Sequence, residues 1–280
     1  MKRSFIIHAK RTPVGKIGGT LSLARPDDML AELMKDYLKK ISFDPALVDD
    51  VIAGCANQAG EDNRNIARMA ALLAGLPYEV PATTMNRLCG SSLDATIDAA
   101  ARIGSGFAEC IFVGGTESMT RAPLGETAEN VAEKLKISRE DQDLFALESH
   151  QKAIKAQETG AFKDEILPIT IKMRKSETSV TKDECPRKET SLDILAKLKP
   201  VFREGGSVTA GNSSPMNDGA AFVVVVSEDF LKKHNLTPIL EITGMGVRGI
   251  HPDIMGLGPV EAIKNLESKF SIKRKNFDVI

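Results

Sequence analysis

The sequence predicts an α/β fold in which strands are linked by crossover helices. Short apolar runs that read as strands alternate with amphipathic segments that read as helices over residues 4–115. The run at residues 110–113 is wholly apolar and ends at Gly114 and Gly115, which is typical of a buried parallel strand. Apolar strand character returns only at residues 220–226, so one core strand follows a long polar stretch.

The first elements follow from the spacing of apolar residues. Residues 4–7 predict a first strand, and apolar side chains at helical spacing predict a helix over residues 27–40. A short strand is expected at residues 51–53. A second helix is expected over residues 64–74, because Gly75 follows it as a stop signal.

The next elements surround a tight turn. Residues 82–86 read as a strand that turns at residues 87–90, and residues 91–103 carry apolar side chains at helical spacing. This pattern places Cys89 directly before the start of a helix.

The middle of the chain is more polar than a core would be. Residues 126–160 are charged and helical, and Ser138 and Asp141 have the spacing of a reciprocal helix cap. Residues 172–189 mix acidic and basic side chains and read as an excursion from the core. We therefore expect a core domain formed by residues 1–123 and 217–237, with residues 124–216 inserted into it as a loop domain.

Residues 238–280 read as the incomplete start of a second α/β domain. They predict a strand at residues 239–242, a helix at residues 259–269 and a further strand from Phe277. One such unit leaves apolar helix faces and an open sheet edge without cover. We therefore expect this sequence to be a fragment of a longer protein.

Composition excludes several classes of function. The formal net charge is −1, which gives no electrostatic reason to expect nucleic acid or an anionic membrane as a partner. No apolar run approaches the length of a membrane span, and the apolar run at residues 5–7 is too short for a secretory leader. A cytoplasmic protein is therefore expected.

The chain has four cysteines, and they form no CxxC pair or Cys/His cluster, so no metal site is predicted. In a cytoplasmic protein they should be reduced thiols. A free cysteine is usually a small buried hydrophobe, and this is the interpretation for Cys55, Cys110 and Cys185.

Cys89 is the strongest candidate for chemistry. Its position before a helix offers unpaired N–H groups and the positive end of the helix dipole, which favour a thiolate. The small residues 90–92 allow a substrate to approach the sulfur closely. The physical logic is that of the nucleophile elbow of hydrolases, with sulfur in place of oxygen. On these features alone, a buried structural cysteine that caps a helix is an equally good reading.

Longer motifs identify a family. The segment NRLCGSSLDA around Cys89 resembles the nucleophile motif of the thiolase family, in which this cysteine accepts the acyl group as a thioester. RTPVGKIGG, VGGTESMTRAP, TAENVAEKLKISREDQD and GSVTAGNSSPMNDGAA resemble further thiolase motifs in the same order. The block GCANQAGEDNRNIARMAALLAGLP is most similar to the 3-oxoadipyl-CoA thiolase subgroup. The resemblance implies a thiolase-like layered fold, with an α/β/α core built on a mixed sheet.

The resemblance also implies roles for individual residues. Ser214 in TAGNSSP matches the serine that contacts the pantetheine arm of CoA, and Arg187 matches the arginine near the nucleotide end of CoA. Without the motifs, Arg187 would read as a solvated charge and Ser214 as ordinary turn chemistry. Asn212 and Asn217 read as turn residues that support this loop. CoA and acyl-CoA are expected as substrates, with no cofactor, and a homodimer or homotetramer is expected.

This sequence departs from the thiolase pattern in two places. The family's further catalytic motifs, NEAFA, GHP and CxGG, would all lie beyond Ile280. In addition, Pro123 runs almost directly into TAEN, where the family has a few dozen residues that include the tetramer-forming loop. The four histidines stand in no matching motif and read as structural or exposed: His8, His150, His234 and His251.

The resemblance implies an acetyl-CoA acyltransferase that cleaves a 3-oxoacyl-CoA with CoA, or runs the reverse condensation. Three alternatives stay open. The first is a biosynthetic acetyl-CoA acetyltransferase with a different acyl pocket. The second is a non-catalytic truncated thiolase that binds CoA or a partner chain. The third is a condensing enzyme of the ketosynthase kind, against which the TAGNSSPMNDGAA motif argues.

Overall fold

The computed structural model describes residues 2–57, 65–121, 127–173, 176–273, 275, 277 and 278. The chain separates into two compact units. The sheet unit contains residues 1–122, 159–185 and 216–243, and the helical unit contains residues 123–158, 186–215 and 244–280.

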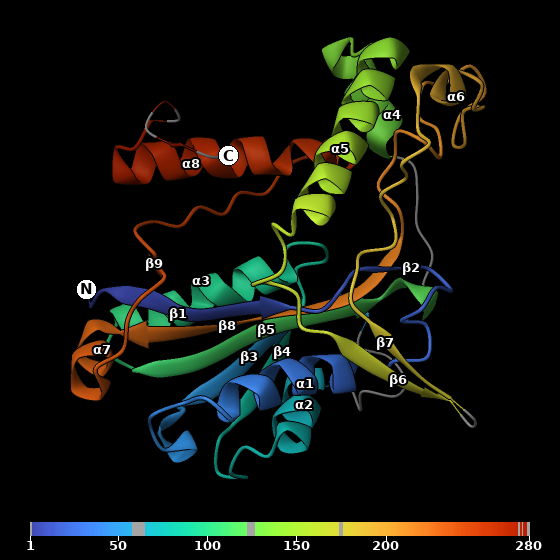
Figure 1. The fold of residues 1–280 in the computed structure, drawn as a ribbon. Helices are drawn as coiled ribbons and strands as arrows, with labels where there is room; N and C mark the ends of the chain where they lie inside the picture. Colours follow the sequence, from blue (N-terminus) through green and yellow to red (C-terminus); the bar gives the residue numbers. More distant parts are fainter. Residues whose placement is uncertain are drawn as a thin grey trace. The chain divides into compact units, whose positions relative to one another are not determined.

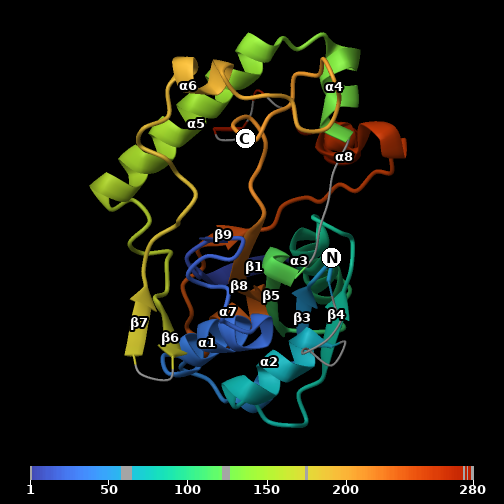
Figure 2. The same cartoon turned by 90° about the vertical axis from the view of Figure 1, so that its right-hand side faces the viewer.

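A mixed sheet forms the centre of the sheet unit (Figure 1). Its strands run in the order β4-β3-β5-β8-β1-β9, and β2 pairs with β8. The β4–β3–β5 pairings are parallel, whereas β8 is antiparallel to both β5 and β1. Figure 2 shows β4 at the outer edge of the sheet. The strands are β1 (Ser4–Arg11), β2 (Gly15–Lys16), β3 (Asp50–Gly54), β4 (Ala82–Met85), β5 (Cys110–Ser118), β8 (Asn217–Ser227) and β9 (Leu240–Glu241).

Helices cover both faces of this sheet (Figure 1). The helices α1 (Pro26–Leu38) and α2 (Ile66–Ala74) bury Leu30, Met34 and other apolar side chains on one face. The helix α3 (Ser91–Gly104) buries Ala95, Ala99 and Ile103 on the other. The sheet unit therefore has the α/β/α layering that was expected.

The central strands are longer than the sequence predicts. β5 is buried along almost its whole length and continues through the two glycines to Ser118. At Gly114 an added Cβ would stand 2.6 Å from a methyl carbon of Leu30, so a glycine here lets α1 pack closely on the sheet. Glycine reads as a strand terminator in a sequence, and here close helix packing outweighs that tendency.

The helix predictions hold well, and the two ends of α2 show local signals that make such a prediction possible. α2 starts after Asn65, whose Oδ1 accepts the N–H of Arg68, and ends at Gly75, which has a φ of 90°. The predicted start at residue 64 lies outside the described residues. α1 and α3 agree with their predicted ranges within two residues.

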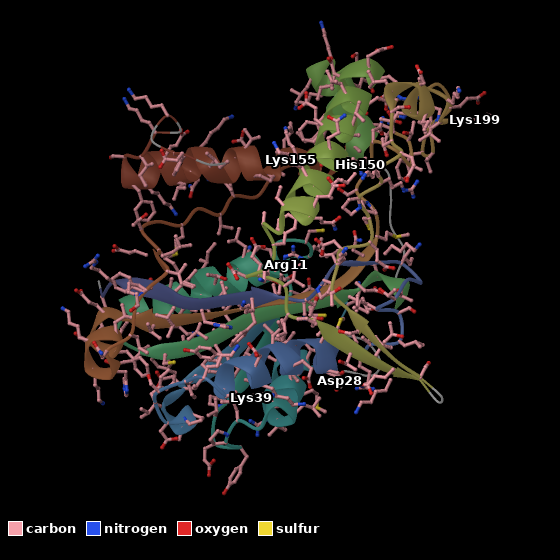
Figure 3. All side chains as sticks on the ribbon, viewed as in Figure 1. Arg11, Asp28, Lys39, His150, Lys155 and Lys199 are labelled. Carbon is pink, nitrogen blue, oxygen red and sulfur yellow. The ribbon has the colours of Figure 1, made fainter. Side chains whose placement is uncertain are left out.

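One hairpin in the sheet unit was not anticipated. β6 (Ile169–Met173) and β7 (Ser176–Val180) pair as a separate antiparallel sheet within the stretch that reads as a polar excursion. Arg11 ties β1 to the segment after this hairpin, since its guanidinium pairs with Asp183 at 2.8 Å (Figure 3). The remaining elements of the sheet unit are η1 (Pro45–Leu47), η2 (Met119–Arg121) and α7 (Glu228–His234).

The helical unit is held by buried polar contacts as well as by apolar packing. Glu129 is 5% exposed, and its carboxylate accepts the main-chain N–H groups of Ser207 and Val208. The cap of α5 forms as predicted, since the N–H of Asp141 donates to the Ser138 hydroxyl at 3.0 Å. The helices of the helical unit are α4 (Thr127–Leu135), α5 (Arg139–Thr159), α6 (Leu192–Ala196), η3 (Pro252–Leu257) and α8 (Gly258–Phe270).

Predictions for the last part of the chain hold in part. α8 matches the predicted helix, and the short β9 lies within the predicted strand at residues 239–242. The strand predicted from Phe277 is not present at Phe277 or Asp278, and the rest of it lies outside the described residues.

Candidate active site

Cys89 lies in the sheet unit, between the end of β4 and the start of α3, and its side chain is exposed. Cys55 and Cys110 are buried, as predicted, and burial raises the pKa of the Cys110 thiol. The prediction of a buried Cys185 is wrong. This thiol is half-buried, because it lies in a polar loop where the side-chain amide of Asn217 donates to its sulfur at 2.8 Å.

The turn before Cys89 is tight and strained. Leu88 has a φ of 49°, a left-handed conformation that is unfavourable for a residue with a branched side chain. Asn86 stabilises it, because its Oδ1 accepts the N–H of Leu88 at 2.8 Å. Ser91 stabilises it from the helix side: its Oγ accepts the N–H of Arg87 at 2.8 Å and donates to the Leu88 carbonyl at 2.5 Å. The surrounding structure therefore fixes a backbone that the sequence alone disfavours.

Two glycines set the position of the helix start. An added Cβ at Gly54 would collide with the backbone of Ser91 and Ser92, and one at Gly115 would collide with the Ser92 side chain. Because Gly54 ends β3 and Gly115 lies in the adjacent β5, the first turn of α3 rests directly on the sheet. This contact fixes the first turn of α3 on the sheet just after Cys89, and the N-cap residue between them, Gly90, has no side chain.

Glu117 contacts the loop that leads from β3 toward this turn. Its carboxylate accepts the N–H of Ala56 at 2.9 Å and the side-chain amide of Asn57 at 3.0 Å. Glu117 and Ser118 lie inside β5, and Ser118 donates to the buried carboxylate of Asp218 at 3.0 Å.

Arg187 lies in the helical unit, in the segment that precedes α6, and is exposed. Its main-chain N–H donates to Nδ1 of His150 on α5 at 3.2 Å (Figure 3). Burial and the charge of Arg187 lower the pKa of His150, so this imidazole is neutral near pH 7. A neutral His150 keeps the nitrogen that accepts the Arg187 N–H.

Ser214 is also exposed and lies in a loop that Asn212 organises, as the sequence predicts. Oδ1 of Asn212 accepts the N–H of Thr209 at 2.7 Å. Its Nδ2 donates to Asp143 at 2.9 Å and to the Ser207 carbonyl at 3.0 Å. Arg187 and Ser214 thus share the helical unit, whereas Cys89 belongs to the sheet unit.

The four histidines occupy structural or exposed positions, as expected. His8 stacks on Tyr37 with ring centroids 4.4 Å apart, and burial lowers its pKa to about 4. His234 stacks on Phe230 at 4.3 Å, and His251 is exposed. Among the described residues, no group of three or more His, Cys, Asp or Glu side chains is arranged to hold a metal ion. Within the same residues, every helix is too short or too polar to cross a bilayer.

Comparison with known proteins identifies the family. The thiolase N-terminal domain model matches residues 4–126 and 121–229. The chain belongs to the thiolase family. This thiolase is 44% identical to the beta-ketoadipyl-CoA thiolase of Pseudomonas aeruginosa over 315 positions, which cover 99% of this chain and 79% of that protein. A crystal structure of the Bacillus anthracis acetyl-CoA acetyltransferase matches with a TM-score of 0.94 and 38% identity, over 100% of this chain and 79% of that chain. The thiolase-like fold predicted from the sequence is confirmed.

The comparisons show a length difference of the kind that a missing internal segment predicts. This thiolase is 44% identical to the 3-oxoadipyl-CoA/3-oxo-5,6-dehydrosuberyl-CoA thiolase of Escherichia coli, over 100% of this chain and 80% of that protein. That alignment spans 320 positions, whereas the chain has 280 residues, so at least 40 positions have no residue here. The two matches to the family model meet at residues 121–126, where the sequence motifs place the gap.

Sequence reasoning found the nucleophile candidate but not what holds it. Gly54, Gly115 and Glu117 lie far from Cys89 along the chain, and their function depends on strand register. The one available signal was the pair of glycines followed by an acidic residue at the end of a buried strand.

Proposed function

We propose that this thiolase uses Cys89 to cleave a 3-oxoacyl-CoA whose acyl chain ends in a free carboxylate, as in 3-oxoadipyl-CoA. The observation that carries the proposal is the exposed Cys89 thiol on a braced turn at the start of α3. The relatives from Pseudomonas aeruginosa and Escherichia coli, whose names include this substrate, support the choice of acyl chain.

The reaction proceeds through an acyl-enzyme. The Cys89 thiolate attacks the 3-oxo carbon of the substrate, and the bond between C2 and C3 breaks. The acyl group stays on sulfur as a thioester, and the departing C2 takes up a proton to give acetyl-CoA. The thiol of a second CoA then attacks the thioester, which releases the shortened acyl-CoA and regenerates the cysteine.

We also propose that the helical unit binds CoA, with Arg187 near the nucleotide end and Ser214 on the pantetheine arm. An exposed guanidinium suits a phosphate group. The loop with Ser214 is organised by Asn212, so its hydroxyl has a defined place from which to contact a ligand. CoA and acyl-CoA are substrates in this proposal, and no other cofactor takes part.

Acylation of Cys89 tests this function. We expect 3-oxoadipyl-CoA to transfer an acyl group to the protein, detected as a mass increase on the peptide that contains Cys89. The Cys89→Ala variant should show none, while Cys185→Ala should behave like the unaltered protein. Absence of any acyl-enzyme from 3-oxoadipyl-CoA and from acetoacetyl-CoA would favour a non-catalytic protein that binds CoA.

The acyl chain separates the proposal from its main alternative. A biosynthetic acetyl-CoA acetyltransferase would form the acyl-enzyme from acetyl-CoA or acetoacetyl-CoA faster than from 3-oxoadipyl-CoA. The Bacillus anthracis acetyl-CoA acetyltransferase, with its TM-score of 0.94, is the specific observation in favour of that alternative. The ratio of the acylation rates for the two substrates decides between them.

We further propose that the protein is a homodimer formed along β4. This strand is the outer strand of the sheet and pairs only with β3 in the described chain, so its other edge is free to pair. After β4 the chain passes through Leu88 in the turn and Leu93 in α3, which are 71% and 68% exposed. The cytoplasmic location stays a prediction of the sequence.

Light scattering tests the dimer. Leu93→Glu should convert a dimer to monomers, because it places charge on the surface next to β4. Phe107→Glu is the matched control, since Phe107 is 80% exposed and follows the opposite end of α3. A monomer in the unaltered protein would contradict the proposal.

A further inference from the structure

A chain of hydrogen bonds connects Glu117 to the turn that carries Cys89. The Glu117 carboxylate accepts the N–H of Ala56 at 2.9 Å. The carbonyl of the same residue, Ala56, accepts Nδ2 of Asn86 at 2.9 Å. Oδ1 of Asn86 in turn accepts the N–H of Leu88 at 2.8 Å, one residue before the cysteine. Each of these three hydrogen bonds therefore has its own donor and its own acceptor.

Glu117, where this series of hydrogen bonds starts, is anchored in the sheet. Glu117 lies in β5, where it pairs with Gly219 of β8 in the centre of the sheet. The second carboxylate oxygen is also occupied, by the side-chain amide of Asn57 at 3.0 Å. Because both oxygens accept hydrogen bonds from residues 56 and 57, the carboxylate fixes this loop as a unit.

Asn86 and Leu88, where this series of hydrogen bonds ends, need such support. Leu88 has a φ of 49°, a left-handed conformation that is unfavourable for a non-glycine residue. Asn86 holds it only if its own side-chain orientation is fixed, and the bond to the Ala56 carbonyl fixes that orientation. When this bond is lost, the Asn86 amide is free to rotate and the turn before Cys89 is free to relax.

We propose that Glu117 is a positioning residue for the nucleophile, acting through Ala56 and Asn86 on the turn at Leu88. The inference rests on the proposed role of Cys89 as the acyl acceptor. It assigns to Glu117 no contact with substrate and no proton transfer. The carboxylate holds the main chain that orients the turn, and so determines how much of the protein presents its thiol ready to react.

The test compares alkylation of two thiols in one molecule. Iodoacetamide is applied briefly to the full chain, and the labelling rates of Cys89 and half-buried Cys185 are read from their peptides. Glu117→Gln replaces one acceptor oxygen by an amide that faces a donor. Asn86→Asp keeps the acceptor for the Leu88 N–H and removes the donor to Ala56. Glu109→Gln is the matched control, since Glu109 pairs with Lys2 just before β5.

We expect each variant to lower the Cys89-to-Cys185 rate ratio by about five- to ten-fold, the effect of losing about one hydrogen bond. The double variant should be no slower than the slower single variant, because both changes break the same chain. Glu109→Gln should leave the ratio unchanged. The rates at which 3-oxoadipyl-CoA acylates Cys89 should rank the unaltered protein and the variants in the same order as the alkylation ratios.

Several results would overturn the inference. An unchanged ratio in Glu117→Gln with a lowered melting temperature would show a structural role only, and multiplying effects in the double variant would show that the two residues act independently. If Glu117→Gln does not fold, Asn86→Asp alone decides, because it leaves the carboxylate in place. A Cys89 in the unaltered protein that reacts no faster than Cys185 would instead refute the proposed nucleophile, and that result is visible without any variant.

Discussion

Two loops of this thiolase use the same side chain for different purposes. Asn86 organises the turn at Cys89, and Asn212 organises the loop of Ser214; in each case Oδ1 accepts a main-chain N–H. The two side-chain amides differ in the groups to which they donate. Asn86 reaches a carboxylate only through the Ala56 peptide, whereas Asn212 donates directly to Asp143. The first loop contains a left-handed leucine, and the second has no non-glycine residue with positive φ among its residues 207–214.

This difference separates a strained site from a relaxed one. In the turn before Cys89, contacts from the sheet hold the backbone in an unfavourable conformation. This pattern is expected where a side chain must be presented for reaction. In the loop of Ser214, a partly buried, charge-assisted bond from Asn212 to Asp143 stabilises an ordinary backbone, which suits a surface for binding. Changes in the first loop should therefore alter the reactivity of Cys89, whereas changes in the second should alter stability alone.

The largest effect is expected where the first loop rests on the sheet. Gly54→Ala would drive a Cβ into the backbone of Ser91 and Ser92, so the start of α3 must shift. We expect a loss of about 3 kcal/mol of unfolding free energy, measured by denaturant titration. Gly249→Ala is the control, because no atom of the described residues lies within 4 Å of its Cβ position. A stable Gly54→Ala variant with unchanged alkylation of Cys89 would show that this contact does not position the thiol.

A smaller effect is expected in the second loop. Asn212→Ala removes three hydrogen bonds and leaves the buried Asp143 with Arg139 as its partner, so we expect a loss of about 2 kcal/mol. Asn212→Asp keeps the acceptor for Thr209 but places a second carboxylate beside Asp143, and should be at least as destabilised. Thermal unfolding measures both. If alkylation of Cys89 fell together with stability, the contrast between the two loops would be lost.

The smallest effect is expected at the strained residue itself. Leu88→Gly relieves the left-handed conformation, but glycine loses more backbone entropy on folding, so the unfolding free energy should change by less than about 1 kcal/mol. Leu72→Gly, at an exposed position inside α2, should instead cost about 1 kcal/mol. Equal losses in the two variants would show that Leu88 is not under strain.

The sequence was sufficient for most of the fold and for the choice of one candidate nucleophile. Helices such as α2 were predictable because Asn65 and Gly75 mark their ends locally. The hairpin of β6 and β7 was missed, because four of the five residues of β7 are exposed and carry no apolar alternation. Cys89 was predicted as the nucleophile because it precedes a helix within a motif that resembles that of the thiolases. The role proposed for Glu117 was not predicted, since it depends on the loop that the register of β3 and β5 brings beside it.

The position of β8 has a consequence for how the chain is made. During synthesis, β3, β4, β5 and their helices emerge together and can pair at once. β1 emerges first, yet its sheet partner is β8, with Ser4 opposite Ser227. At about 5–20 residues per second the ribosome needs roughly 10–45 s to deliver that partner. Throughout this interval the apolar β1 has no strand beside it, and β5 has one open edge. Closure of the sheet is therefore a late, long-range step, and these two edges are where a newly made chain is most exposed to aggregation or to chaperone capture.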